Sequence, residues 1–248
     1  MNNVRLIIGG ARSGKSSLAE QYAKSSNLPV TYIATAQAFD AEMQQRIAQH
    51  QADRPEHWQL IESPLQLAKT IELVLSNSQQ DSCILVDCLT LWLSNSLLKP
   101  SDEIEHGSEC NLSYWQQEKR QLLSLLESLQ QGKSLQQGKS LQQENSFQQP
   151  DNVQSNDGSQ SQNSQSENSQ SENSQSQNCQ PRQVEIILVS NEVGHGIVPM
   201  GELSRQFVDQ AGWLHQAIAR IANEVEFVMA GLPLTLKSSE KINSKVVL

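Results

Sequence analysis

The sequence is poor in the features that mark several large protein classes. Its 248 residues include only four cysteines and 4% aromatic residues, and no apolar run approaches the length of a membrane span. No two cysteines stand in a Cys-x-x-Cys pair, so their spacing indicates neither a zinc site nor a disulfide framework. Free thiols in a reducing compartment are the simpler interpretation. We therefore expect a cytoplasmic protein without a removable leader.

Positive charge is also scarce. The chain has 18 lysines and arginines against 27 acidic residues, which gives a net charge of −9 and a pI near 5.1. This balance argues against a general nucleic-acid-binding protein, so we expect no nucleic-acid partner. The net negative charge is still compatible with a local basic pocket that holds nucleotide phosphates.

The most informative stretch is Gly9-Gly10-Ala11-Arg12-Ser13-Gly14-Lys15-Ser16. It follows an apolar run at 4–8 and precedes a helical pattern at 18–23, which is the context that a phosphate-binding P-loop requires. Glycines let successive N–H groups point into one concavity, and the start of the helix adds unpaired N–H groups and a positive dipole end. Lys15 would add a mobile charge for the β- and γ-phosphates, and the Ser16 hydroxyl would be a Mg²⁺ ligand.

Strand and helix patterns alternate along the rest of the chain. Apolar runs indicate strands at 30–34, 58–62, 83–87, 184–190 and 225–230, and the helical patterns lie at about 41–51, 64–75, 89–98, 114–130 and 202–224. Ser63 as N-cap with Gln66 predicts a capping box for the helix after Pro64. This alternation predicts an α/β, P-loop NTPase-like fold with a mostly parallel sheet covered by helices.

The composition changes sharply at about 131–181. Two Gly-Lys-Ser repeats lead into a tract of glutamine, serine and asparagine with almost no apolar surface to offset the entropy cost of ordering. We predict one P-loop domain over residues 1–248, interrupted there by a disordered low-complexity insertion. Expansion of a tolerated surface loop explains such a tract, and self-association through glutamine is the alternative.

Several residues at predicted strand ends are candidates for a nucleotide site. Asp87 ends the run 83–87; in P-loop enzymes such a strand lies beside the first one, and its aspartate reaches the Mg²⁺ shell. Glu62 ends another strand, where it could accept hydrogen bonds from a ribose or a guanine, or simply be solvated. The loop after the strand at 30–34 begins with Thr35, and ligands of open α/β sheets bind at such carboxyl ends.

A histidine between two arginines is a further candidate. Arg46, His50 and Arg54 are spaced by four, so they could share a helix face. Two flanking cations suit phosphate chemistry and favour a neutral imidazole. Taken alone, a histidine in this setting is more often a plain surface residue.

Taken in order, six motifs resemble one known family. They are the P-loop, Tyr32-Ile33-Ala34-Thr35, Arg46-Ile47 with His50, Arg54-Pro55 with Trp58, Asp87-Cys88-Leu89-Thr90 and Asn191-Glu192-Val193-Gly194-x-Gly196-Ile197-Val198-Pro199. The chain resembles the CobU/CobP family, the bifunctional adenosylcobinamide kinase and adenosylcobinamide-phosphate guanylyltransferase of cobalamin biosynthesis. The resemblance covers about 4–129 and 184–237. The tract at 131–181 departs from it.

The resemblance implies two reactions. The first moves the γ-phosphoryl group of ATP or GTP to the hydroxyl of adenosylcobinamide. The second moves GMP from GTP to adenosylcobinamide phosphate, with His50 as the nucleophile that carries GMP, and releases pyrophosphate. The resemblance also implies Mg²⁺ at Ser16 and Asp87, catalysis by His50 and Lys15, and a homo-oligomer. Its nucleotide contacts would be Gly9, Gly10, Ala11, Arg12, Ser13, Gly14, Lys15, Ser16, Ala34, Thr35, Ala36, Gln51, Ala52, Asp53, Arg54, Glu62 and Asp87.

Two other functions fit parts of the sequence. A plain P-loop kinase for small molecules would need the P-loop, Mg²⁺ and a base, but no covalent intermediate. A nucleotide-gated regulatory protein would use the glutamine-rich tract as its interaction arm. The family motifs lie in the predicted ordered parts and are absent from the tract, which favours the enzyme.

Overall fold

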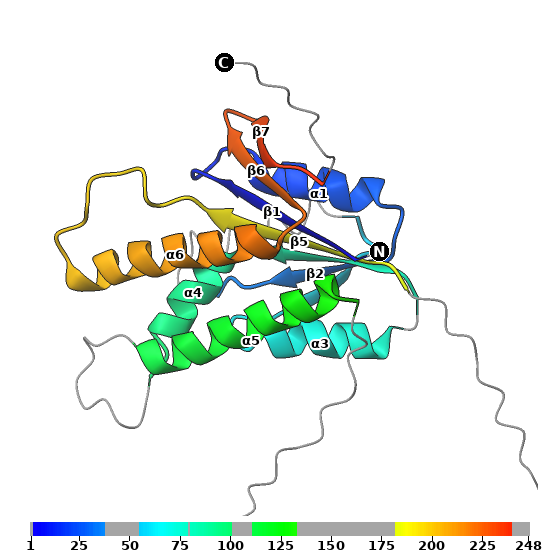
Figure 1. Ribbon diagram of the computed structural model, residues 1–248, viewed down its shortest axis with the longest axis horizontal. Coiled ribbons are helices and arrows are strands. Elements are labelled where there is room, and N and C mark those ends of the chain that lie inside the picture. Colours follow the sequence, from blue (N-terminus) through cyan, green and yellow to red (C-terminus); the bar gives the residue numbers. More distant parts are fainter. Residues whose placement is uncertain (1, 38–54, 79, 101–110, 133–181, 240–248) are drawn as a thin grey trace, which may run out of the picture. The chain divides into compact units, whose positions relative to one another are not determined.

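A seven-stranded sheet lies at the centre of the computed structural model, which describes residues 2–37, 55–78, 80–100, 111–132 and 182–239 (Figure 1). The strand order is β3-β2-β4-β5-β1-β6-β7, and every neighbouring pair is parallel except β6 and β7. The strands are β1 Asn3–Gly9, β2 Val30–Ala34, β3 Gln59–Glu62, β4 Ser82–Asp87, β5 Val184–Asn191, β6 Glu224–Met229 and β7 Leu232–Lys237.

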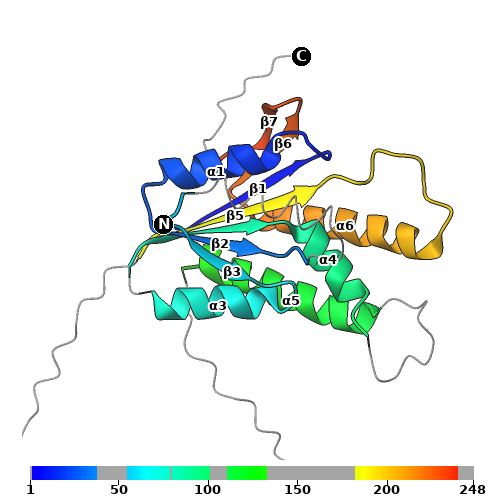
Figure 2. The ribbon, with the colours of Figure 1, turned by 180° about the vertical axis from the view of Figure 1, so that it is seen from behind.

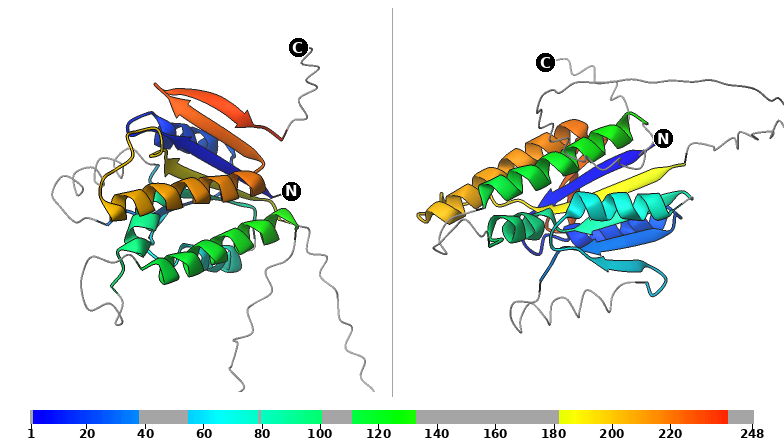
Figure 3. Two further views of the ribbon diagram at one scale, coloured as in Figure 1. Left: turned by 60° about the vertical axis from the view of Figure 1, so that its left-hand side comes forward. Right: turned by 90° about the horizontal axis from the view of Figure 1, so that it is seen from below.

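Helices cover both faces of this sheet. They are α1 Lys15–Ser25, α3 Leu67–Asn77, α4 Leu89–Leu97, α5 Leu112–Gln130 and α6 Glu202–Ile221. Helix α1 lies on one face, and the other four lie on the opposite face, as Figures 2 and 3 show. The predicted α/β fold with a mostly parallel, helix-covered sheet is confirmed.

The alternation of side chains along each strand produces two cores. Val4, Leu6 and Ile8 of β1 pack into the core beneath the four helices, whereas Ile7 points to the side of α1. Trp92 of α4 is fully buried in the core beneath the four helices. The central strands β1, β2, β4 and β5 are thus buried on both faces, which is why they contain nearly continuous apolar runs.

These elements belong to one unit of the chain, formed by residues 1–136 and 181–248. The remaining unit, 137–180, lies outside the described residues, as does nearly all of the predicted insertion at 131–181. The expectation of a single interrupted domain stays a prediction.

The strand order corrects one expectation about Asp87. We expected its strand, β4, to lie beside β1, but β5 lies between the two and pairs with both. Both β4 and β5 are short apolar runs that end in a polar residue, so the hydrophobic pattern could not show which of them lies beside β1. The order of the sheet depends on how the connecting helices cross it, and the strand sequences alone do not encode that.

Two helix boundaries and one strand also differ from the expectation. Helix α3 begins at Leu67, so Gln66 is its N-cap, and the Ser63 hydroxyl instead donates to the Leu65 carbonyl at 2.8 Å. Helix α6 ends at Ile221, because Asn223 exchanges hydrogen bonds with the backbone of Val4 and turns the chain into β6. The strand β7 was missed altogether. It forms an antiparallel hairpin with β6, and Pro233 is tolerated there because β7 is an edge strand.

Removing residues 133–180 should leave the sheet intact. The Asn2 side chain donates to the Leu129 carbonyl at 2.8 Å and accepts from the Val184 N–H at 3.2 Å, so one short side chain spans the two flanks of the segment. A short linker can therefore close the gap, and loop closure costs less for a shorter loop. We expect the deletion variant to keep its thermal unfolding midpoint and its enzymatic turnover. A variant that folds but has lost turnover would contradict this prediction.

Candidate nucleotide-binding site

The P-loop connects the end of β1 to the start of α1. A Cβ atom on Gly9 would lie 2.5 Å from the Val228 carbonyl oxygen and 2.6 Å from the Ser13 Oγ, so no side chain fits there. Gly14 is the N-cap of α1 and has φ 97°, a left-handed conformation that glycine adopts without strain. The loop is also held from outside, because the Gly231 N–H in the turn between β6 and β7 donates to the Ser13 carbonyl at 2.8 Å.

Lys15 is the charged group at the centre of this loop. Its side chain is buried, and its Nζ donates to the Gly10 carbonyl at 3.0 Å. Burial lowers the pKa of Lys15, while the nearby Asp87 carboxylate acts in the opposite direction. The lysine is thus folded back over the loop, beside the free N–H groups of the first turn of α1. Such an arrangement suits an anion, and anion binding at this loop stays a prediction.

The other described candidates lie at the same edge of the sheet. Asp87 ends β4, Ala34 ends β2 and Glu62 ends β3, and the register pairs Ala34 with both acids. Because adjacent strands are about 4.8 Å apart, β4 lies roughly 10 Å and β3 roughly 19 Å from β1 across the sheet. Figure 1 shows β1, β2 and β5 pointing to this common edge. The predicted residues therefore line one edge without forming one tight cluster.

Thr35 has a different environment from the one expected for a ligand contact. Its side chain is fully buried, its hydroxyl donates to the Cys88 carbonyl at 2.7 Å, and it accepts from the Cys88 N–H at 2.9 Å. The Thr35 N–H also donates to the Asp87 carbonyl at 3.2 Å. The hydroxyl thus fixes the segment that carries Asp87, whose carboxylate accepts from the Tyr32 hydroxyl at 3.2 Å. A contact between residue 35 and a nucleotide stays a prediction.

The end of β5 carries residues that the sequence analysis did not single out individually. The Glu192 N–H donates to the Gly9 carbonyl at 2.9 Å, which ties this segment directly to the P-loop. The Glu192 Oε1 accepts from the Gly194 N–H at 2.6 Å, and its Oε2 lies 3.6 Å from the His215 Nδ1. The His215 Nε2 in turn is 2.7 Å from the Ser190 Oγ. Burial lowers the pKa of His215, and Glu192 opposes that shift.

The part that His215 plays in this network could not be predicted from its helix. His215 stands in the middle of α6, where the helical pattern alone gives no sign of a partner on β5. Only the position of β5 beside β1 brings the Glu192 segment next to the P-loop.

The remaining candidates lie outside the described residues. They are His50, Gln51, Ala52, Asp53 and Arg54, together with Arg46 and the predicted helix at 41–51. Within the described ranges, no three metal-ligating side chains gather in one cluster. No helix in those ranges has both the length and the apolar character needed to span a bilayer.

Known proteins similar to this chain point to one family. The chain is 42% identical to the bifunctional adenosylcobalamin biosynthesis protein CobP of Pseudomonas aeruginosa, over 94% of this chain and 96% of that protein. It is 30% identical to the corresponding CobU protein of Escherichia coli, over 94% and 98%. A solved structure from Pyrococcus horikoshii OT3 covers 96% of this chain and 88% of its own, with a TM-score of 0.44 at 8% identity, and adds nothing to the assignment. The CobU family model, cobinamide kinase / cobinamide phosphate guanyltransferase, matches residues 5–134 and 145–236, and the chain therefore belongs to this family.

Proposed function

We infer that the chain is a bifunctional enzyme of cobalamin biosynthesis, and we propose that it transfers GMP through a covalent intermediate on His50. It phosphorylates adenosylcobinamide with ATP or GTP and then moves GMP from GTP to adenosylcobinamide phosphate, which gives adenosylcobinamide-GDP and pyrophosphate. The observation that carries the proposal is the intact P-loop between β1 and α1 in a chain of this family. A plain kinase is not favoured, because the family description includes guanylyl transfer.

The P-loop suits both reactions, because both move or release phosphate groups of a nucleoside triphosphate. The N–H groups at the start of α1 and the Lys15 ammonium would stabilise the negative charge on the transferring and leaving phosphates. A bound triphosphate would take over the hydrogen bond that Lys15 now gives to the Gly10 carbonyl. Glu62 and Ala34 to Ala36 would lie farther along the edge, on the side of the nucleoside.

The same edge can accommodate Mg²⁺ that arrives with the nucleotide. Such an ion usually keeps several waters and takes only one or two protein carboxylates besides the phosphates, which fits the Asp87 carboxylate near Lys15. The Asp87 carboxylate and the Ser16 hydroxyl would hold it. When bound, it would neutralise part of the charge on the phosphates.

His50 would act as the nucleophile of the second reaction. A neutral imidazole is a good nucleophile near neutral pH, and covalent catalysis divides one difficult transfer into two easier ones. The N–P bond to the imidazole would form as the bond between the α-phosphorus and pyrophosphate breaks. Attack by adenosylcobinamide phosphate would then release the imidazole. Gln51 to Arg54 would contact the nucleotide beside it.

The location and assembly of the enzyme complete the proposal. We place it in the cytoplasm as a homo-oligomer. Among the described residues, Cys83 and Cys88 are buried free thiols, which is compatible with a reducing compartment.

The decisive test uses GTP labelled at either the α- or the γ-phosphate. After incubation with Mg²⁺ and denaturation, we expect label on the protein from the α-phosphate only, stable to alkali and labile to acid. His50→Ala should abolish this label and the guanylylation while leaving GTP affinity close to that of the wild type. Lys15→Ala is the comparison, because it should weaken GTP binding itself.

Two results would count against the covalent step. One is the absence of label in protein shown to bind GTP, which would favour the plain kinase if adenosylcobinamide is still phosphorylated. The other is a loss of GTP affinity in His50→Ala as large as that in Lys15→Ala.

A further inference from the structure

An apolar cavity lies between α4, α6 and the loop that follows β5. It has a volume of about 380 Å³. Its walls come from the end of α4, the two ends of the loop and the first two turns of α6, through Leu97, Leu98, Val193, Pro199, Leu203 and Phe207. Apart from two serines, Ser94 and Ser204, its lining is apolar. Figure 1 shows these three segments together beyond the carboxyl edge of the sheet.

The loop that contributes Val193 and Pro199 to this cavity also exposes large apolar side chains. Ile197 and Met200 of the loop are 97% and 96% exposed, and Val198 is also exposed. Leu98 and Leu203 line the cavity itself and are still 59% and 41% exposed. Isolated exposed apolar residues are ordinary, but exposed leucines that line an apolar cavity are typical of a binding site.

The backbone connects this cavity to the P-loop. Glu192, whose N–H bonds to the Gly9 carbonyl, is followed directly by Val193 in the cavity wall. Helix α4 begins two residues after Asp87 and reaches the cavity at its other end. A molecule seated in the cavity would therefore lie next to the edge of the sheet where the transferred phosphoryl group is expected.

We propose that this cavity binds the corrinoid substrate. The inference rests on the proposed function, from which it takes the substrate. A corrinoid has a broad ring with methyl groups and amide side chains on its rim, so it offers a large apolar surface edged by amides. The cavity is large enough for one flank of such a ring, and the exposed Ile197, Val198 and Met200 would cover more of it. A nucleotide, being highly charged, has no matching feature in this apolar lining.

A smaller cavity of about 160 Å³ adjoins the first and shares Val193, Pro199 and Val208 with it. It adds polar groups that the larger cavity lacks. The Asp209 carboxylate can accept from an amide N–H of the substrate, and Arg205 already holds the loop by donating to the Pro199 carbonyl at 3.3 Å. The two cavities together thus match the two kinds of surface on a corrinoid.

The test compares Leu203→Asp with Leu73→Asp. Leu203 and Leu73 are both exposed leucines on helices, at 41% and 54%, but Leu73 lies on α3, outside the cavity. Binding of adenosylcobinamide without nucleotide is followed by its visible absorption, and the KM for adenosylcobinamide and for GTP is measured separately. We expect Leu203→Asp to raise both the Kd and the KM for the corrinoid at least tenfold, because a charge replaces apolar contact, and to leave the KM for GTP unchanged. Leu73→Asp should change none of them.

Other results would overturn the proposal. A Leu203→Asp protein with unchanged corrinoid affinity excludes the site. So does a change that Leu73→Asp reproduces, or one that affects GTP equally. If instead Leu203→Asp alters only the sedimentation coefficient, a second copy of the chain covers this surface. The labelling of His50 needs no corrinoid. If the wild type is not labelled, the covalent step is rejected, and the corrinoid-binding measurement still tests the cavity independently.

Discussion

Replacing Lys15 by methionine should lower the turnover of both reactions by about 10³-fold, the size of effect seen when one preorganised donor to a developing charge is removed. Methionine keeps most of the length and the apolar stem of the lysine while deleting its charge and its hydrogen bond to the Gly10 carbonyl. In the proposed mechanism this ammonium stabilises the charge that builds up as a phosphoryl group transfers or pyrophosphate leaves, so kcat should fall. The measurement is steady-state kinetics with each substrate.

A matched control stands on the same helix. Lys24 lies near the end of α1, and its side chain is 48% exposed and 3.9 Å from the Glu20 carboxylate. Lys24→Met removes the same charge from an exposed site, where such pairs contribute little, and should leave kcat close to the wild-type value. Rates within about threefold of the wild type in Lys15→Met would contradict the assigned role, provided that both variants unfold at similar temperatures.

The P-loop could be predicted from sequence because its function depends on the backbone. Gly9 has no space for a side chain and Gly14 has a positive φ, so glycine is required at both positions and can be recognised in the sequence. Lys15 and Ser16 follow at a fixed offset in the first turn of the helix. The motif lies within eight consecutive residues, and the structure agrees with its strand, loop and helix, although the Val228 carbonyl that closes off Gly9 belongs to β6.

Features that depend on distant segments could not be predicted in the same way. The insertion of β5 between β1 and β4 follows from the paths of the crossovers, which buried strands do not reveal. The network of Glu192, His215 and Ser190 depends on that insertion. The strand β7 did leave a signal, the alternation of leucine with other residues from Leu232 to Lys237, but Pro233 obscured it.

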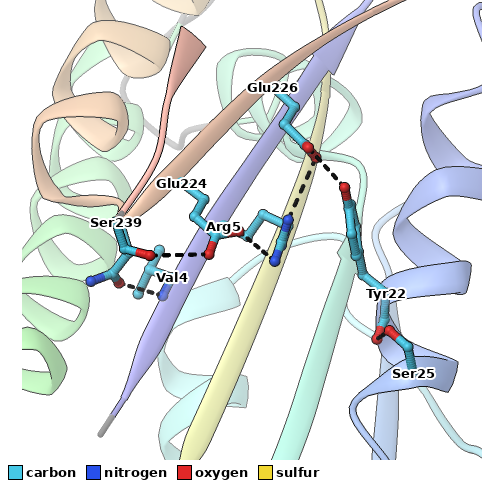
Figure 4. Close-up of polar contacts among 8 residues, drawn as sticks. Val4, Arg5, Tyr22, Ser25, Glu224, Glu226 and Ser239 are labelled. Atoms are coloured by element: carbon cyan, nitrogen blue, oxygen red, sulfur yellow. Dashed lines mark hydrogen bonds and ion pairs between the residues drawn. The ribbon is translucent and has the colours of Figure 1, made fainter. Parts of the chain in front are cut away.

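The same limit applies to a charged cluster that no motif indicates. Arg5 of β1 forms an ion pair with Glu224, and its Nη1 lies 3.6 Å from the Glu226 Oε2 (Figure 4). The Tyr22 hydroxyl donates to the Glu226 Oε1 at 2.7 Å, and the Arg5 guanidinium lies 3.7 Å from the centroid of the Tyr22 ring. Burial, together with Glu226, raises the pKa of Tyr22 to about 12. In the sequence, most of the chain separates Arg5 and Tyr22 from the two glutamates.

We expect Arg5→Leu to lower the free energy of unfolding by about 3–5 kcal/mol, because it leaves the Glu224 and Glu226 carboxylates without their cation in a largely buried place. The Arg5 and Glu226 side chains are only 13% and 8% exposed, so water cannot replace the lost contact. Urea unfolding followed by circular dichroism measures the change. The triple variant with Glu224→Gln and Glu226→Gln should recover much of the loss, since the two carboxylates that Arg5 pairs with are then neutral. A loss below about 1 kcal/mol in Arg5→Leu would mean that the cluster is solvated like a surface pair.

The loss should also depend on pH, through a third acid near the cluster. Burial raises the pKa of Glu185 above its ordinary 4.5, and Arg5 opposes that shift. A carboxyl group whose pKa is raised in the folded state favours folding below pH 4.5, and this contribution disappears as the pH rises through the folded pKa. Without Arg5 the pKa of Glu185 rises further, so the unfolding free energy of Arg5→Leu should fall more between pH 5 and pH 8 than that of the wild type. Parallel curves over this range would show that Arg5 stabilises the fold by packing on Tyr22 rather than by its charge.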